Sequence, residues 1–396
     1  MFLPIHGKQE WEQFWNCWRN KMNKLLRFYT VSYLIITFSA ILIERIPFLF
    51  LIREGYILLL FVIVSTIQIT KFRLNSISIT VLFYIALNTF SLLISQNRGD
   101  GIGSYIMFVS GPIIFLFLSN VALSVQWYKK YRKCIDRLLF FFVFTSLILY
   151  PVQGVFAETM HIDTKMMYRW SSSGTRWMRL TGLSFHATSM GAVAIFAVIF
   201  SLLHRKKMKM LLSSISYYLT NSRTVLFGII FAFYSTQRKK IRFLMLICSV
   251  PMICGIVVFY FSYTFDPSAL IHFADVFIRG PNLLSKNLSL FGRGHGMMSP
   301  YTADSPYIHL ESDLYISIMQ VGILGFSTYI LLLFFLVSRL KKDRNIYAKY
   351  CVYILFIINI GGIFFPLHTV RFLTNYMWIE LGLYFSYRRN LKVCHK

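Results

Sequence analysis

Long apolar runs separated by short polar connections are the main pattern along the chain. An apolar run of about 17–25 residues can cross the hydrocarbon core of a bilayer as a helix, which satisfies its own backbone hydrogen bonds there. This rule predicts twelve membrane-spanning helices. Their expected ranges are 28–44, 54–70, 74–94, 102–125, 138–156, 183–203, 208–221, 223–236, 243–264, 314–338, 346–366 and 372–387. The seventh and eighth are short and meet at Asn221-Ser222-Arg223, as a tight pair of helices or as one broken helix.

The composition agrees with this pattern. Hydrophobic residues make up 56% of the chain and charged residues 14%, whereas an average soluble domain is about 25% charged. We therefore predict an all-α, polytopic membrane protein in which residues 1–396 form a single integral membrane domain. No internal repeat and no separate soluble domain is visible in the sequence.

The charge distribution predicts the orientation. The net charge is +26, with 41 Lys and Arg residues against 15 Asp and Glu residues. The basic residues gather in short loops, which excludes nucleic acid as the expected partner. One side of the predicted membrane holds 28 of them and the other 12, with Lys349 inside a span. Because basic loops stay in the cytoplasm, both termini are expected there.

Two predicted outer loops are long, at residues 157–182 and 265–313, whereas every cytoplasmic connection is short. Long loops in compact proteins are usually functional or disordered. The chemistry of the protein is therefore expected on the outer face. None of the six cysteines falls in a predicted outer segment, so neither a disulfide framework nor a cysteine-ligated metal site is indicated.

The first outer loop carries Arg169, Arg176 and Arg179, interleaved with Trp170 and Trp177. The planar guanidinium fork suits phosphate oxygens and keeps its charge when partly buried. The plainer interpretation is an interfacial belt, because Trp and Arg also favour the level of the lipid headgroups.

Arg223 lies at the turn between the two short spans. It is either an anion ligand or a side chain that snorkels to the interface.

The second outer loop contains the glycine-rich run Phe291-Gly292-Arg293-Gly294-His295-Gly296. No strand precedes it, so a nucleotide-binding loop is not supported. We expect a flexible turn whose backbone amides, together with Arg293, approach an anion.

His309, Glu311 and Asp313 come directly before the tenth span. Carboxylates at a membrane boundary are costly unless they are solvated or paired. Their spacing is not a trusted metal-ligand pattern, so no metal is expected. Glu380 lies within the twelfth span, where a structural ion pair is the favoured interpretation.

These features resemble the superfamily of bacterial O-antigen polymerases (Wzy) and O-antigen ligases. Three pieces carry the resemblance, and together with the spans and loops they cover nearly the whole chain. They are Arg179-Leu-Thr-Gly182-Leu-Ser-Phe-His186-Ala187, then Leu219-Thr220-Asn221-Ser222-Arg223, and Phe291-Gly292-Arg293-Gly294 followed by a helix with Gly322-Ile-Leu-Gly325.

The resemblance implies a metal-independent glycosyltransferase of the bacterial inner membrane, without a cofactor, that acts during lipopolysaccharide biosynthesis. Its substrate would be an undecaprenyl-pyrophosphate-linked oligosaccharide within membrane lipid, and its partners a chain-length regulator (Wzz) and a flippase (Wzx). The expected pyrophosphate ligands are Arg179 and Arg223, then Arg293 and Arg176. The expected general base is Asp313, Glu311 or His309.

The stretch before the Gly-x-x-Gly helix favours a polymerase. Ligases of the superfamily typically place a His just ahead of this helix, whereas this chain has Glu311-Ser-Asp313, with His309 about two residues earlier. A ligase that transfers the polymer to lipid A-core remains an alternative. So does a flippase, which should show polar groups at the bilayer midplane and discontinuous helices.

Overall fold

A computed structural model describes thirteen parts of the chain. They are residues 17, 24, 75–95, 98–120, 123–159, 168–170, 176–182, 187–220, 222, 278–295, 312–343, 345–364 and 371–394. The predicted spans 28–44, 54–70, 223–236 and 243–264 lie outside these residues, so the total of twelve stays a prediction.

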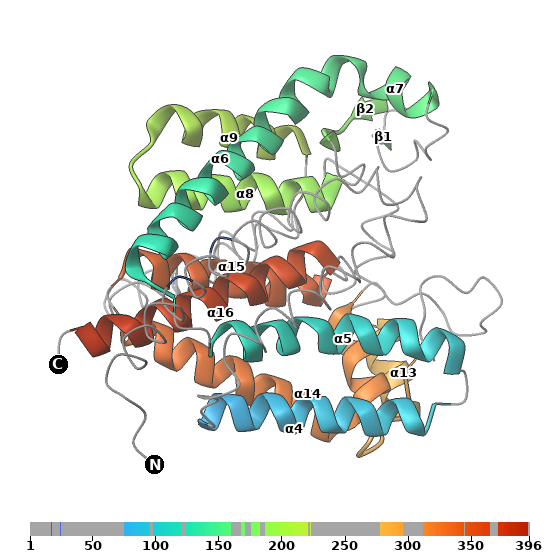
Figure 1. The fold of residues 1–396 in the computed structure, drawn as a ribbon. Helices are drawn as coiled ribbons and strands as arrows, with labels where there is room; N and C mark the ends of the chain where they lie inside the picture. The colour runs from blue at the N-terminus through green and yellow to red at the C-terminus, as the bar shows by residue number, and fades with distance from the viewer. Residues whose placement is uncertain are drawn as a thin grey trace, which may run out of the picture.

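The described part is almost entirely helical (Figure 1). Its longer elements are α4 (Ser76–Leu93), α5 (Arg98–Leu118), α6 (Val125–Leu149), α8 (Ala187–Leu203), α9 (Lys207–Thr220), α14 (Asp313–Lys341), α15 (Ile346–Phe364) and α16 (Arg371–Cys394). Its shorter elements are η1 (Tyr150–Val152), α7 (Gln153–Thr159), α13 (Gly280–Asn287) and the strands β1 (Tyr168–Trp170) and β2 (Arg176–Met178).

Within this part, five helical stretches are long and apolar enough to span a membrane, in α4, α5, α6 to α7, α14 and α15. Helix α8 is a shorter apolar helix. The protein is therefore a multi-pass membrane protein. We call the end of the bundle that carries the strands and α13 the hairpin end, and the end where α16 terminates the C-terminal end (Figure 1).

Two sequence predictions need correction. The fourth span was expected to reach residue 125, but α5 ends at Leu118. Residues 126–137 were expected as a cytoplasmic loop, but they form the first turns of α6, which Ser124 caps by accepting from Trp127 N at 3.1 Å. The reason is amphipathicity: one face of these turns is buried, while the Lys side chains point outward.

The all-α prediction also missed a small antiparallel pair of strands in the first long loop. Arg169 is opposite Trp177 in β1 and β2, with one further residue pair on each side. The pair is too short to change the helical class. Because β2 ends at Met178, it leads the chain directly into the segment that begins at Arg179.

Helix α16 is the centre of the bundle and contacts α5, α6, α8 and α15. Every described side chain from Leu373 to Tyr384 is buried. Helix α5 approaches closely through Gly111, because an added Cβ there would meet the Trp378 ring. Since protein surrounds α16, it tolerates polar residues that a lipid-facing helix would exclude.

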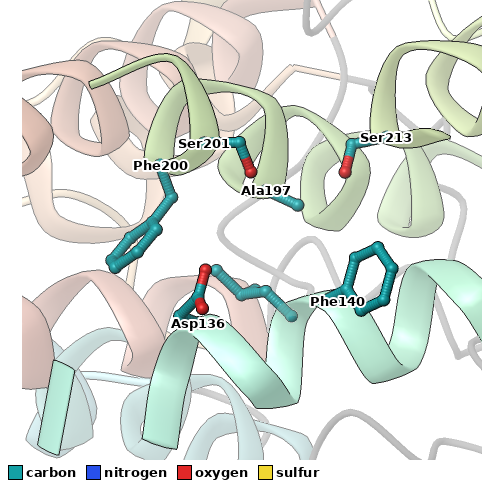
Figure 2. A pocket seen from close by; sticks show the side chains of 7 residues that line it. Asp136, Phe140, Ala197, Phe200, Ser201 and Ser213 are labelled. Atoms are coloured by element: carbon teal, nitrogen blue, oxygen red, sulfur yellow. The ribbon is translucent and has the colours of Figure 1, made fainter. Parts of the chain in front are cut away.

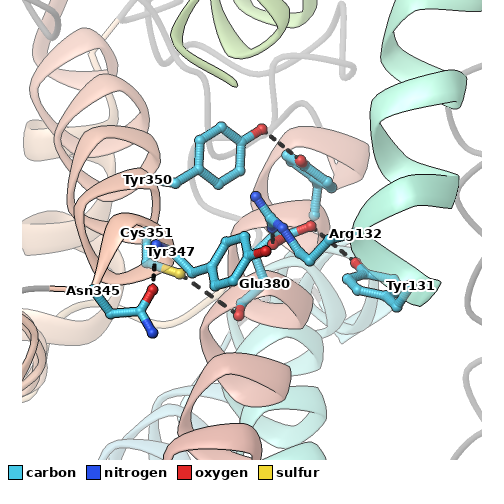
Figure 3. Close-up of polar contacts among 8 residues, drawn as sticks. Tyr131, Arg132, Asn345, Tyr347, Tyr350, Cys351 and Glu380 are labelled. Carbon is cyan, nitrogen blue, oxygen red and sulfur yellow. Dashed lines mark hydrogen bonds and ion pairs between the residues drawn. The ribbon is translucent and has the colours of Figure 1, made fainter. Parts of the chain in front are cut away.

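Arg132 of α6 and Glu380 of α16 form a buried ion pair (Figure 3). Their exposed fractions are 2% and 0%. Tyr131 Oη donates to the Glu380 carboxylate at 2.9 Å, and the Arg132 guanidinium carbon lies 4.5 Å from the Tyr350 ring centre and 4.7 Å from that of Phe200. The rings replace part of the lost hydration. The predicted structural role of Glu380 is thus confirmed, with a partner from the segment expected to be a loop.

The ion pair generates a stability prediction. Glu380→Gln leaves the Arg132 charge uncompensated, so we expect the free energy of unfolding to fall by about 3–5 kcal/mol. The double variant Arg132→Met/Glu380→Leu should lose much less, because no charge remains buried. Thermal unfolding of the purified protein in detergent measures both.

Arg388→Gln is the control, because it breaks the partly exposed Arg388–Asp343 pair at 3.2 Å and should cost at most about 1 kcal/mol. A double variant as unstable as Glu380→Gln would contradict the electrostatic explanation.

Candidate functional site

The segment that follows the strands packs against the end of α9. Leu180 N donates to Leu219 O, and Arg179 Nε donates to Thr220 O, each at 2.9 Å. Residues 180–182 are buried, and Arg179 is half-buried. The first two pieces of the resemblance, which are far apart in the sequence, are therefore in contact at the hairpin end.

Gln153, the first residue of α7, holds this segment in place. Its side-chain amide donates to Arg179 O, and its carbonyl oxygen accepts from Thr181 N at 3.2 Å. Tyr150 Oη donates to Met178 O at 2.9 Å. Sequence reasoning missed Gln153, because nothing in the local sequence shows that its partners come from residues beyond the strands.

The Arg179 side chain also has a plain structural role. Its Nε binds a carbonyl at the C-terminal end of α9, where the helix dipole favours a positive charge. That bond uses one of the five guanidinium donors and restrains the orientation of the group.

Of the other residues expected at this site, the structure describes Arg176. Arg176 pairs through its backbone with Trp170 in the strands. Arg223, Glu311 and His309 lie outside the described residues, so their roles stay predictions.

The third piece of the resemblance contains a break in a membrane helix. Helix α14 loses its helical backbone at Gly322, where φ is 73° and ψ is −178°. Residues 289–294 fill the break with four backbone hydrogen bonds of 2.9–3.2 Å. These are Arg293 N to Met319 O, Gly294 N to Gln320 O, Ile323 N to Ser289 O, and Leu324 N to Leu290 O.

This pairing corrects the expected flexible turn. The amides of Arg293 and Gly294 already donate to α14, so they are not offered to an anion. Gly292, at φ 78°, lies directly against the Gln320 backbone, where a side chain would collide. The Arg293 side chain is exposed, with Nη2 3.5 Å from Lys286 O.

His295 completes a polar cluster behind the break. It is 0% exposed, and its Nδ1 lies 3.3 Å from Ser104 Oγ, which donates to Gln320 Oε1 at 2.9 Å. Burial lowers the pKa of His295 to about 4, against a smaller opposing effect of its hydrogen bond with Gln320. The ring is therefore neutral at physiological pH. Sequence reasoning gave His295 no role, because its partners come from distant helices.

Asp313 begins α14 and is 6% exposed. The positive end of the helix dipole stabilises its carboxylate. Gly362 of α15 makes room for it, because an added Cβ there would lie 2.6 Å from Asp313 Oδ2. Met319, which accepts from Arg293 N, lies about 9 Å further along the helix axis at about 1.5 Å per residue. Asp313 and the Arg293 backbone are therefore held by one half-helix.

The two clusters lie at the same end of the bundle but against different helices. Figure 1 shows the strands near α7 and α9, well separated from α13, which lies beside α14. The convergence of Arg179, Arg223 and Arg293 on one ligand stays a prediction. Among the described residues, no three His, Cys, Asp or Glu side chains are grouped to hold a metal ion.

Comparison with known proteins adds no assignment. No family model matches the sequence, and no curated protein is significantly similar to it.

The break in α14 generates a stability prediction. Gly322→Ala or Gly292→Ala places a Cβ against backbone atoms at a positive φ. We expect either change to lower the free energy of unfolding by about 3 kcal/mol or more. Gly103→Ala in α5 is the control, because its Cβ meets nothing within 4 Å. Thermal unfolding in detergent compares them, and equal stability of all three variants would refute the close pairing.

The close packing of Asp313 against Gly362 can be tested by a double-mutant cycle. Gly362→Ala should lower the free energy of unfolding by about 1–3 kcal/mol, because the new Cβ displaces the carboxylate. In an Asp313→Ala background the same change should cost little. Chemical unfolding of the four proteins measures the coupling, and an equal cost in both backgrounds would show that the carboxylate is not the group displaced.

Proposed function

We propose that the protein is a glycosyltransferase of the O-antigen polymerase type. It joins undecaprenyl-pyrophosphate-linked oligosaccharide repeat units at the periplasmic face of the inner membrane. The observation that supports this most is the pairing of segments: residues 179–182 meet the end of α9, and residues 289–294 meet the break in α14, both at the hairpin end.

The reaction forms a bond between the acceptor hydroxyl oxygen and C1 of the donor sugar, and breaks the bond from C1 to the pyrophosphate oxygen. Negative charge grows on the departing undecaprenyl pyrophosphate, which fixed guanidinium groups stabilise. The acceptor proton passes to a base within hydrogen-bond reach. The substrate arrives activated, so the reaction needs no nucleotide.

The described residues suit this division of roles. The Arg179 side chain is oriented by its hydrogen bond to Thr220 O, and its backbone is held by the Gln153 side chain. A preorganised anion ligand requires such support. Asp313 is a buried carboxylate at the hairpin end, and we assign it as the general base, with Glu311 and His309 as alternatives. Arg293, whose backbone is bound to the half-helix that begins at Asp313, would bind the second phosphate.

A flippase for lipid-linked repeat units is the second candidate. The observation that favours it is the break in α14, because discontinuous membrane helices often line transport sites. The break here is filled by backbone from residues 289–294, which favours a fixed structural role. Deletion separates the two functions: loss of a polymerase leaves lipid A with a single repeat, whereas loss of a flippase leaves none.

Substitution of Arg179 tests the polymerase proposal. Arg179→Ala should reduce polymer formation about a hundredfold, because a fixed donor to the developing charge is lost. Arg179→Lys should also impair it, since Lys offers no planar fork. The assay supplies membrane fractions with a defined lipid-linked repeat unit and measures product length.

Lys342→Ala, at the C-terminal end, is the control and should polymerise normally. Insertion of each variant is verified by the amount of folded protein. Polymer formed at the wild-type rate by Arg179→Ala would overturn the assignment.

A further inference from the structure

At the C-terminal end of the bundle, two lysines share one carboxylate. Lys206 Nζ lies 2.7 Å and Lys209 Nζ 2.8 Å from the same oxygen, Asp136 Oδ2. Because both ammonium nitrogens lie within hydrogen-bond distance of one oxygen, they are also close to each other. Since Asp136 balances only one of them, the triad keeps one positive charge, and the two like charges repel each other.

The surroundings add to this positive charge. Asp136 is the only acidic residue in 125–137 and 204–209, whereas Lys133 and Arg137 are exposed beside it. The pKa of His204 is lowered, first by burial and then by the charges of Arg132 and Lys206. No other carboxylate from these segments is available to neutralise the triad.

The turn between α8 and α9 presents Lys206 in a fixed position. Arg205 has a φ of 57°, and Lys206 N donates to Ser201 O at 2.8 Å. A left-handed non-glycine residue costs about 1–2 kcal/mol, so the contacts of the neighbouring residues maintain this turn. The triad is therefore part of a constrained helix junction.

A narrow recess lies beside the triad, between α6, α8 and α9 (Figure 2). Its lining combines apolar and polar side chains, those of Asp136, Leu139, Phe140, Ala197, Phe200, Ser201 and Ser213. Among the described residues, none forms a hydrogen bond with the buried Ser213 hydroxyl. Further along α6, Phe141 and Phe144 are exposed, as expected for a lipid-facing surface.

We propose that Lys206, Lys209 and Asp136 form a binding site for the phosphate of an anionic phospholipid, such as phosphatidylglycerol. A phosphodiester with one negative charge neutralises the triad, and its acyl chains continue along the apolar surface of α6. Side-chain exposures of 40% for Lys206 and 28% for Lys209 leave both ammonium groups accessible to a headgroup. Basic sites between helices on the cytoplasmic side commonly bind such headgroups. The site is independent of the proposed glycosyl transfer.

The test uses full-length protein in nanodiscs of phosphatidylcholine with or without phosphatidylglycerol. Thermal unfolding and the amount of phosphatidylglycerol retained after purification are measured. The neutral variant Asp136→Asn/Lys206→Gln/Lys209→Gln keeps polar groups but no charge, and should retain about fivefold less phosphatidylglycerol. It should also lose the stabilisation that this lipid gives the wild type.

Two further variants sharpen the result. Asp136→Asn raises the charge of the site, so it should retain at least as much phosphatidylglycerol as the wild type. Lys342→Gln removes one charge from another helix at the same end and should behave as the wild type. Wild-type retention by the neutral variant, or weaker retention by Asp136→Asn, overturns the proposal. Equal stabilisation by inorganic phosphate in detergent also overturns it, because the site would then bind a free anion.

Discussion

Every backbone amide and carbonyl inside a membrane needs a hydrogen-bond partner, and the hairpin end of this protein is organised by that requirement. The break at Gly322 deprives α14 of part of its own ladder, and residues 289–294 supply the replacements. The pairing requires backbones to approach closely, which explains two glycines at positive φ that face each other. As a consequence, the loop that carries Arg293 cannot move independently of α14.

Charged groups inside the bundle also need partners, and leaving a charge unpaired there costs more free energy than leaving a backbone group unpaired. Glu380 pairs with a guanidinium and accepts from a tyrosine hydroxyl, and aromatic rings pack against that guanidinium. Asp136 has two ammonium groups. Glu380 binds Arg132, and Asp136 binds Lys206; Arg132, Asp136 and Lys206 all belong to segments that hydropathy alone assigns to loops. The C-terminal end is thus held by ionic contacts between helices, whereas backbone pairing predominates at the hairpin end.

Local hydropathy was sufficient to predict α4, α14 and α15, whose observed bounds lie within about three residues of the expected ranges. It failed at α6, because a basic helix with one buried face has the average hydropathy of a loop. The sequence shows that Glu380 needs an ionic partner within the bundle, but it does not show that Arg132 is that partner. Gly322 and Gly292 were visible as glycines, yet only their long-range contact explains them. Gln153 had no sequence signal at all, since its role depends on where the strands direct the chain.

The geometry of the α14 half-helix bears on the chemistry proposed. Asp313 stands at its first residue, and the backbone of Arg293 is bound about 9 Å further along. If Asp313 acts as the base and Arg293 as the anion ligand, as proposed, the hydrogen bonds between residues 289–294 and α14 hold their backbones in a fixed relation to each other. Arg179 belongs to a separate cluster, so under the proposed function the lipid-linked substrate would bridge the two clusters, and its binding would complete the site.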